Sequence, residues 1–233
     1  QDEGSEKLLA SIGITNVKVC GDTRFDRVLE IREQAKPLSI VEYFARKAKE
    51  ENEKIFVAGS SWPKDEDIII PYFNNTTDLK LIIAPHEIDE AHLKYIESNL
   101  QRPHIRYSQA IPEMMGDYDC LIIDSYGLLS SIYRYGHIAY VGGGFGVGIH
   151  NLLEAAVYDI PVVFGPNFKK FREAKQLLER GGGYSISDYQ SFRGLIDEFL
   201  QYEGTLDSAG QHAGDYVRSN SGVVARVMDV LNL

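Results

Sequence analysis

Short apolar runs alternate with longer amphipathic segments along most of the chain, and turn residues separate the two. Apolar runs of about four to eight residues are typical of buried strands, whereas apolar positions three and four apart are typical of helices. We predict strands over residues 16–20, 54–58, 79–84, 104–107, 120–124, 139–141, 162–165 and 184–186. We predict helices over residues 5–12, 40–51, 89–100, 128–135 and 170–180, after the turn at 21–26, near Asp65, after the glycines at 142–148, and beyond 186.

The unit of strand, loop and helix occurs six or seven times. This predicts an α/β fold, a Rossmann-like parallel sheet of six to seven strands with helices on both faces. Ser39 and Glu42 predict a capping box, and the glycines at 181–183 predict the end of a helix. Ligands of such sheets bind outside the carboxyl ends of the strands. The loops expected at that edge are residues 59–62, 85–87, 124–127, 142–151 and 165–170.

The most distinctive stretch is the glycine-rich loop of residues 142–148, with five glycines in seven positions. Glycine suits sharp turns and close approach of the backbone to a ligand, and amides at a helix start attract anions. We expect His150, Asn151 and Glu154 in the first turn of the next helix. Glu154 then lies on the same face as Asn151, where its carboxylate can accept hydrogen bonds from a ribose. The stretch predicts a nucleotide site, although the third glycine of the dinucleotide fingerprint is missing.

Other polar residues at the same edge leave alternatives open. Ser60 and Ser61 follow a strand and could donate to a phosphate, or they could form a polar turn before a helix. Lys169 and Lys170 could meet a phosphate or carboxylate, although solvated surface lysines are commoner. Asp124 and the serine after it are not a nucleophile elbow, because Gly-x-Ser-x-Gly is absent. No complete catalytic set stands out, so the chain is interpreted as a binding unit.

Two histidine patterns suggest metal sites only weakly. His150 and Glu154 are four residues apart, but the local sequence offers no third ligand. His86 and His92 are six apart, which puts them on different faces of a helix. We therefore expect no metal and no cofactor.

Composition narrows the class of protein. The 233 residues are 44% apolar and 25% charged, which is ordinary for one large or two small globular domains. The formal net charge of −10 argues against a nucleic-acid partner. Cys20 and Cys120, each in an apolar run, suggest buried thiols in a reduced, cytoplasmic protein. No apolar run approaches the roughly 20 residues of a membrane span, no signal peptide opens the chain, and its start looks cut from something longer.

Several motifs together resemble one family across almost the whole chain. Residues 142–156, followed by Ile-Pro-Val at 160–162 and Gly-Pro at 165–166, are similar to the C-terminal domain of 3-deoxy-D-manno-octulosonic acid (Kdo) transferases. Residues 21–26 resemble that family's Gly-Asn-Leu-Lys-Phe-Asp segment. Residues 59–61 resemble its Gly-Ser-Thr and residues 124–127 its Asp-Thr-x-Gly. The resemblance implies the C-terminal half of a two-domain GT-B glycosyltransferase.

The resemblance also implies roles for residues. Asn151 and Glu154 would hold the ribose of CMP, the loop after Asp124 would meet the cytosine, and the glycine-rich loop would approach the phosphate and Kdo. The expected substrate-binding residues are Ser60, Ser61, His86, Ser125, Tyr126, Gly127, Gly142, Gly143, Gly144, Gly146, His150, Asn151, Glu154 and Lys170. No catalytic residue is expected, because the family's general base belongs to its N-terminal domain.

Three positions depart from the family pattern. The family has Pro-Arg-His where this chain has Pro85, His86 and Glu87, so an expected cation near the phosphate is absent. Leu128 replaces a Glu, and Ile149 replaces the second glycine of Gly-Gly-His-Asn. These departures leave open how the phosphate is bound.

By this resemblance, residues 1–20 are the tail of an acceptor domain and residues 21–233 bind CMP-Kdo. The whole enzyme would transfer Kdo to a lipid A precursor in lipopolysaccharide biosynthesis, at the cytoplasmic face of the inner membrane. We expect this chain alone to be inactive, with CMP-Kdo as its partner and lipid A reached through the other domain. The alternatives are a GT-B enzyme that uses a UDP-sugar, such as an epimerase, and a nucleotide-binding module without catalysis.

Overall fold

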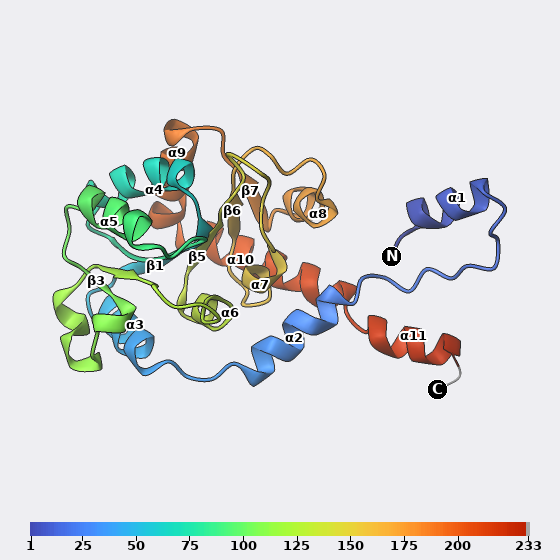
Figure 1. Ribbon diagram of the computed structural model, residues 1–233, viewed down its shortest axis with the longest axis horizontal. Helices are drawn as coiled ribbons and strands as arrows, with labels where there is room; N and C mark the ends of the chain where they lie inside the picture. Colours follow the sequence, from blue (N-terminus) through green and yellow to red (C-terminus); the bar gives the residue numbers. More distant parts are fainter. Residues whose placement is uncertain (232–233) are drawn as a thin grey trace.

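The computed structural model describes residues 1–231, which contain one parallel sheet of seven strands (Figure 1). The spatial order is β3-β4-β2-β1-β5-β6-β7. The strands are β1 (Lys54–Ser61), β2 (Leu79–Pro85), β3 (His104–Arg106), β4 (Cys120–Ile122), β5 (Ile138–Val141), β6 (Val162–Phe164) and β7 (Gly183–Ser185). The predicted α/β class and its parallel sheet are confirmed.

Helices cover both faces of the sheet (Figure 1). The α-helices are α1 (Glu3–Ser11), α2 (Arg24–Gln34), α3 (Ser39–Glu50), α4 (Pro63–Asn74), α5 (Glu90–Asn99), α6 (Leu129–Ile132), α7 (Leu153–Ala156), α8 (Arg172–Arg180), α9 (Tyr189–Gln201), α10 (Glu203–Asn220) and α11 (Val223–Leu231). The 3-10 turns are η1 (Tyr107–Gln109), η2 (Pro112–Asp117) and η3 (Tyr133–Tyr135). Alternate residues of β1 belong to different clusters of the core: Val57 to the cluster that contains residues of α3 and α7, and Phe56 to the cluster that contains residues of α4 and α9. This is the two-residue period of a strand buried on both faces.

The order of the strands reverses at β1. The next three strands in the chain, β2, β3 and β4, lie on one side of β1. The last three, β5, β6 and β7, lie on the other side. β1 pairs with both β2 and β5, and Gly59 stands opposite Val141 near the carboxyl ends. Ligands of open α/β sheets bind at the carboxyl edge where the order reverses. The glycine-rich loop, which follows β5 directly, lies at that position.

The predicted strand over residues 16–20 is wrong. These residues form an extended segment between α1 and α2, and α1 lies apart from the sheet (Figure 1). Arg226 Nε donates to the Cys20 carbonyl oxygen at 3.0 Å, so a side chain of α11 takes an acceptor that a neighbouring strand would otherwise use. Both sides of β1 are already occupied, so this apolar run finds no partner there. None of the helices in residues 1–231 has the length and apolar character that crossing a membrane requires.

The helix ends follow the sequence signals only in part. Gly181, with φ of 74°, ends α8 in the left-handed conformation, as predicted. The capping box at Ser39 is wrong, because Ser39 already lies in α3 and Leu38 is the cap. The Leu38 amide donates to the Tyr135 hydroxyl at 3.1 Å, and that hydroxyl donates to Glu42 at 3.5 Å. Tyr135 of η3 therefore links the amide of the actual cap residue, Leu38, to the Glu42 carboxylate.

His137 makes the stability of the fold depend on pH. Its Nδ1 accepts a hydrogen bond from the Ile55 amide at 3.0 Å, so the ring is neutral at Nδ1. Burial, and secondarily the charge of Lys54, lower the pKa of His137 below its ordinary value. The unfolded chain therefore binds a proton more readily than the folded one. The contribution of His137 to stability is fully present above about pH 6.5. As the pH drops below this value, the contribution falls by at most about 1.4 kcal/mol per pH unit.

Replacing His137 by asparagine tests this expectation. The asparagine carbonyl can accept from the Ile55 amide but does not titrate. We expect urea unfolding at pH 5.5 and 7.5 to show a smaller difference in the His137→Asn variant than in wild type. His150 also has a lowered pKa, and its contribution to the pH dependence of stability is the same in both proteins. An equal pH difference in the two proteins would contradict the role of His137.

Candidate functional site

The glycine-rich loop packs against the end of β1 without room for side chains. A Cβ atom on Gly142 would stand 2.2 Å from the Ser60 carbonyl oxygen. Gly143 has φ of 90°, a conformation that favours glycine. The loop also closes on itself, because the Gly148 amide donates to the Gly143 carbonyl at 3.0 Å. Glycine at these positions lets the backbone of β5 turn across the switch point.

Asp65 anchors this loop from the neighbouring element. It is fully buried in the first turn of α4. One of its oxygens accepts from the amides of Trp62 and Gly143, each at 2.9 Å, and the other accepts from the Tyr140 hydroxyl at 2.6 Å. The carboxylate thus joins the start of α4 to β5 and the glycine-rich loop. From the sequence Asp65 is only a residue near the start of a helix, because two of its three partners, Tyr140 and Gly143, lie far along the chain.

A second anchor comes from the loop after β6. The Asn167 amide donates to the Gly144 carbonyl at 2.9 Å, and its side-chain Nδ2 donates to the Gly146 carbonyl at 2.8 Å. Asn167 lies in the loop expected at the ligand edge, but only its neighbouring lysines were considered there. The glycine-rich loop is consequently held from the β1 side by Asp65 and from the β6 side by Asn167.

The polar residues after the loop are arranged differently from the prediction. α7 is a single turn that begins at Leu153, so His150 and Asn151 precede the helix. Asn151 Oδ1 accepts from the Leu153 amide at 3.2 Å, and its Nδ2 donates to Glu154 Oε1 at 2.9 Å. A one-turn helix carries little macrodipole, so anion binding here depends on loop amides instead. The expected proximity of Asn151 and Glu154 is present.

Three aromatic rings from three loops stack at the same edge. The ring centroids of Trp62 and His86 are 4.7 Å apart, and those of His86 and His150 are 4.4 Å apart. Trp62 Nε1 also donates to His150 Nε2 at 3.3 Å. Burial, followed by the charge of His86, lowers the pKa of His150, whereas Asp65 acts in the opposite direction. His86 and His150 were expected near the nucleotide, but Trp62 was not singled out.

The two serines at the end of β1 have different surroundings. Ser60 has φ of 50° at the bulge where β1 changes its pairing with β2. Ser61 is fully buried, and its hydroxyl donates to Glu66 Oε1 at 2.8 Å. Glu66 also contacts His92 Nε2 at 2.9 Å, and burial raises the pKa of Glu66. In this arrangement the Ser61 hydroxyl supports a buried polar network, while the Ser60 carbonyl oxygen is the nearest atom to a Cβ added at Gly142.

Two strands, β2 and β1, separate the loop after β4 from the glycine-rich loop after β5. Asp124 accepts from the Ser108 amide at 2.9 Å and from the Ser108 hydroxyl, which ties this loop to η1. Ser125 is half-buried, whereas Tyr126 is 74% exposed and Gly127 is exposed with φ of 82°. The loop presents an exposed aromatic ring at the ligand edge of the sheet.

Lys170 lies on the other side of the glycine-rich loop. Its neighbour Phe171 is in contact range of Gly148, and Lys170 itself lines a cavity of about 1050 Å³. The cavity is bordered by residues 1–4, the segment before α2 and the first turn of α8. Arg24 in its wall is paired with Asp22 and Glu173, both at 2.8 Å.

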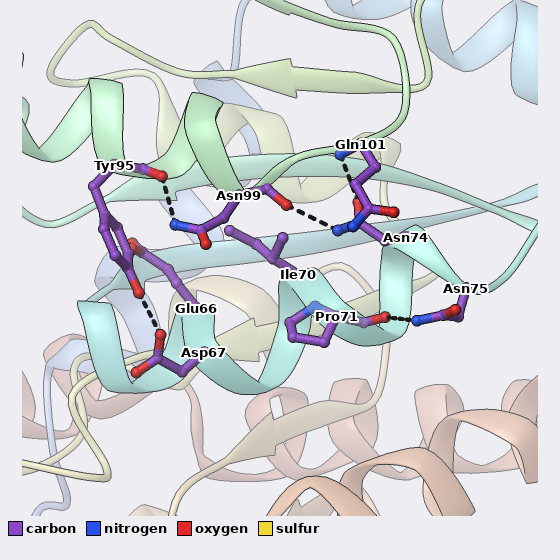
Figure 2. A pocket seen from close by; sticks show the side chains of 9 residues that line it. All are labelled: Glu66, Asp67, Ile70, Pro71, Asn74, Asn75, Tyr95, Asn99 and Gln101. Atoms are coloured by element: carbon purple, nitrogen blue, oxygen red, sulfur yellow. Dashed lines mark hydrogen bonds between the residues drawn. The ribbon is translucent and has the colours of Figure 1, made fainter.

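A second, smaller hollow of about 230 Å³ lies between α4 and α5 (Figure 2). Figure 2 shows that the side chains of its three asparagines are hydrogen-bonded to the protein. Asn74 Nδ2 donates to the Asn99 carbonyl and Asn75 Nδ2 to the Pro71 carbonyl, at 2.8 and 2.7 Å. Tyr95 donates to Asp67 across its mouth. Paired groups offer little to a ligand, so we place the candidate site at the glycine-rich loop.

Comparison with known proteins relates the chain to one family of transferases. No protein-family model matches the chain. The chain is 24% identical over 216 residues to the 3-deoxy-D-manno-octulosonic acid transferase of Rickettsia prowazekii, covering 88% of this chain and 44% of that protein. It is 33% identical over 153 residues to the transferase of the same description from Aquifex aeolicus, covering 63% of this chain and 42% of that protein. The resemblance to the Kdo transferase family is confirmed. The chain spans less than half the length of these Kdo transferases.

Solved structures agree on the fold. The chain superimposes on the C-terminal CMP-Kdo binding domain of WaaA from Acinetobacter baumannii with a TM-score of 0.61, 22% identity, and coverage of 75% of this chain and 97% of that one. It superimposes on Anabaena HepE in complex with UDP-glucose with a TM-score of 0.59, 13% identity, and coverage of 88% and 55%. The fold is thus that of the C-terminal domain of GT-B glycosyltransferases. Together with the resemblance to Kdo transferases, this fold supports a glycosyltransferase-type domain.

Proposed function

We propose that this domain binds CMP-Kdo at the carboxyl ends of β1 and β5, as the donor-binding half of a Kdo transferase. The observation that carries the proposal is the pair formed by Asn151 and Glu154 directly after an anchored glycine-rich loop. Asn151 engages one oxygen of Glu154 and thereby fixes the carboxylate. The other oxygen is left to accept from the hydroxyls of a ribose.

The glycine-rich loop supplies groups suited to a phosphate. Within residues 1–231, the amides of Gly144, Phe145 and Val147 donate to no other group. Amides that point toward an anion form a binding site without any cationic side chain. They would stabilise the negative charge that develops on CMP as it leaves, which is the electrostatic part of the catalysis. In this proposal the loop amides take the place of the arginine that the family carries at the position of His86.

The role in the whole protein follows from this proposal. We propose that residues 21–233 hold and orient the donor, of which 232–233 lie outside the described residues, and that residues 1–20 lead from an acceptor domain. A hydroxyl of a lipid A precursor would attack the anomeric carbon of Kdo while the bond to CMP breaks. The base that takes the hydroxyl proton would come from the acceptor domain, at the cytoplasmic face of the inner membrane. Relatives described as Kdo transferases support this role.

A second candidate is a donor site for a UDP-sugar. The superposition on HepE, whose structure contains UDP-glucose, favours this alternative at the level of fold. Calorimetric titration of the domain with CMP, UMP and UDP separates the two. We expect CMP to bind more tightly than either uridine nucleotide. Equal or tighter binding of UDP would replace Kdo transfer with UDP-sugar chemistry.

Glu154→Gln should weaken the binding of CMP by about tenfold to a hundredfold. Glutamine keeps the shape of the side chain, but it removes the charge that strengthens hydrogen bonds from the ribose, worth roughly 1.5–3 kcal/mol. Calorimetry measures the change, and circular dichroism verifies the fold. Glu179→Gln, an exposed position on α8, is the matched control and should leave affinity unchanged. Unchanged affinity in a folded Glu154→Gln variant would remove Glu154 from the site.

A further inference from the structure

The hydrogen bond from Trp62 to His150 constrains where the histidine proton resides. An indole nitrogen is a donor only, so its partner must be an acceptor. Trp62 Nε1 lies 3.3 Å from His150 Nε2, which therefore carries no proton. A neutral imidazole with a bare Nε2 has its proton on Nδ1. The indole thus selects one of the two tautomers of His150.

The surroundings of His150 keep the ring neutral and in place. Its face stacks on His86, with 4.4 Å between centroids, and His86 stacks in turn on Trp62. A positive charge on His150 would be partly buried and would face a second titratable ring, an effect that outweighs the opposing influence of Asp65. Within residues 1–231, no group accepts a hydrogen bond from His150 Nδ1. The Nδ1 hydrogen is thus available to a ligand.

We propose that Trp62 is a positioning residue that fixes His150 as a neutral Nδ1–H donor to the phosphate of the bound nucleotide. The inference rests on the proposed nucleotide site. It assigns part of the recognition of the phosphate to His150, a residue outside the glycines of the loop. The His150 amide donates to the Gly142 carbonyl at 3.2 Å, so the ring extends from the same loop whose amides we propose as phosphate donors. A neutral donor in this position would complement the amides and would need no protonation of His86.

Long-range proton–nitrogen NMR of the wild-type domain tests the tautomer without any ligand. We expect His150 to show a protonated Nδ1 and an unprotonated Nε2 at pH 7.5. In Trp62→Phe, which keeps a stacking ring but lacks the N–H, we expect a mixture of the two tautomers. His104→Gln is the control, because His104 contacts the Arg102 carbonyl away from this edge. A proton on Nε2 in the wild type would overturn the inference even if Trp62→Phe did not fold.

A double-mutant cycle tests whether Trp62 acts through His150. We expect Trp62→Phe to weaken CMP binding about two- to tenfold, as for the loss of one hydrogen bond. The same substitution in a His150→Gln background should have no further effect, because the group it positions is gone. Equal losses in both backgrounds would show that Trp62 acts independently and would overturn the positioning role. If the wild-type domain did not bind CMP, both the proposed function and the role of His150 as a phosphate donor would be overturned. The NMR experiment would still decide the tautomer of His150.

Discussion

Replacing Asp65 by alanine is expected to lower the free energy of unfolding by about 3–5 kcal/mol, because a buried polar network loses its acceptor. Asp65 is fully buried and accepts from two amides and a tyrosine hydroxyl. Alanine would leave these three donors without a partner, and each unsatisfied buried group costs roughly 1–3 kcal/mol. Urea unfolding followed by circular dichroism measures the change.

Tyr140→Phe is the matched control for this loss. It removes only the hydroxyl that donates to Asp65 and leaves both amides bonded. We expect it to cost about 1 kcal/mol, the net value of one hydrogen bond. A variant Asp65→Ala that unfolds at the same urea concentration as Tyr140→Phe would show that the carboxylate does not anchor the glycine-rich loop.

Gly142→Ala should be the second most damaging change, with a loss of about 3 kcal/mol or more together with the loss of CMP binding. The added methyl group would lie 2.2 Å from the Ser60 carbonyl oxygen and 2.7 Å from the Ser61 Cα. Both are backbone atoms, so no side chain can rotate away and the end of β5 must move from β1. The loop that follows would move with it. Thermal unfolding and calorimetry with CMP measure the two effects.

Gly146→Ala provides the comparison within the same loop. A methyl group there would meet only the Gly143 carbonyl oxygen, at 3.9 Å. We expect its stability to lie within about 1 kcal/mol of wild type. If Gly142→Ala were as stable as Gly146→Ala, the tight packing of the loop on β1 would not be a requirement of the fold.

The sheet and the position of the site could be predicted because their signals are local. Each buried strand is a short apolar run between turns, and repetition of the unit indicates parallel pairing with crossovers. The carboxyl edge then follows from topology, and the glycines at 142–148 indicate which loop lies at the switch point. The nearness of Asn151 and Glu154 also follows from their separation of three residues, although the helix that was expected to carry both begins only at Leu153.

The groups that fix the loop could not be predicted, because their contacts join distant parts of the chain. Asp65 and Gly143 are 78 residues apart, and Trp62 and His150 are 88 apart. From the sequence, Asp65 is only a residue near a helix start and Trp62 only a bulky residue before a proline. The run at 16–20 misled in another way, because a local pattern predicted a strand that the fold does not contain. Its apolar character suits a strand, but in the folded chain this run lies away from both edges of the sheet, beside α11.

Anchoring of the glycine-rich loop from two sides has a consequence for how fast a nucleotide binds. Asp65 and Asn167 hold the loop from elements on opposite halves of the sheet, so the loop is ordered without a ligand. A receptor that is already ordered loses little conformational entropy on association. For the proposed nucleotide we therefore expect no reordering of this loop on binding, and a rate set by diffusion and orientation. The amide hydrogen of Gly143, which is bonded to a buried carboxylate, should exchange with solvent only when β5 itself opens.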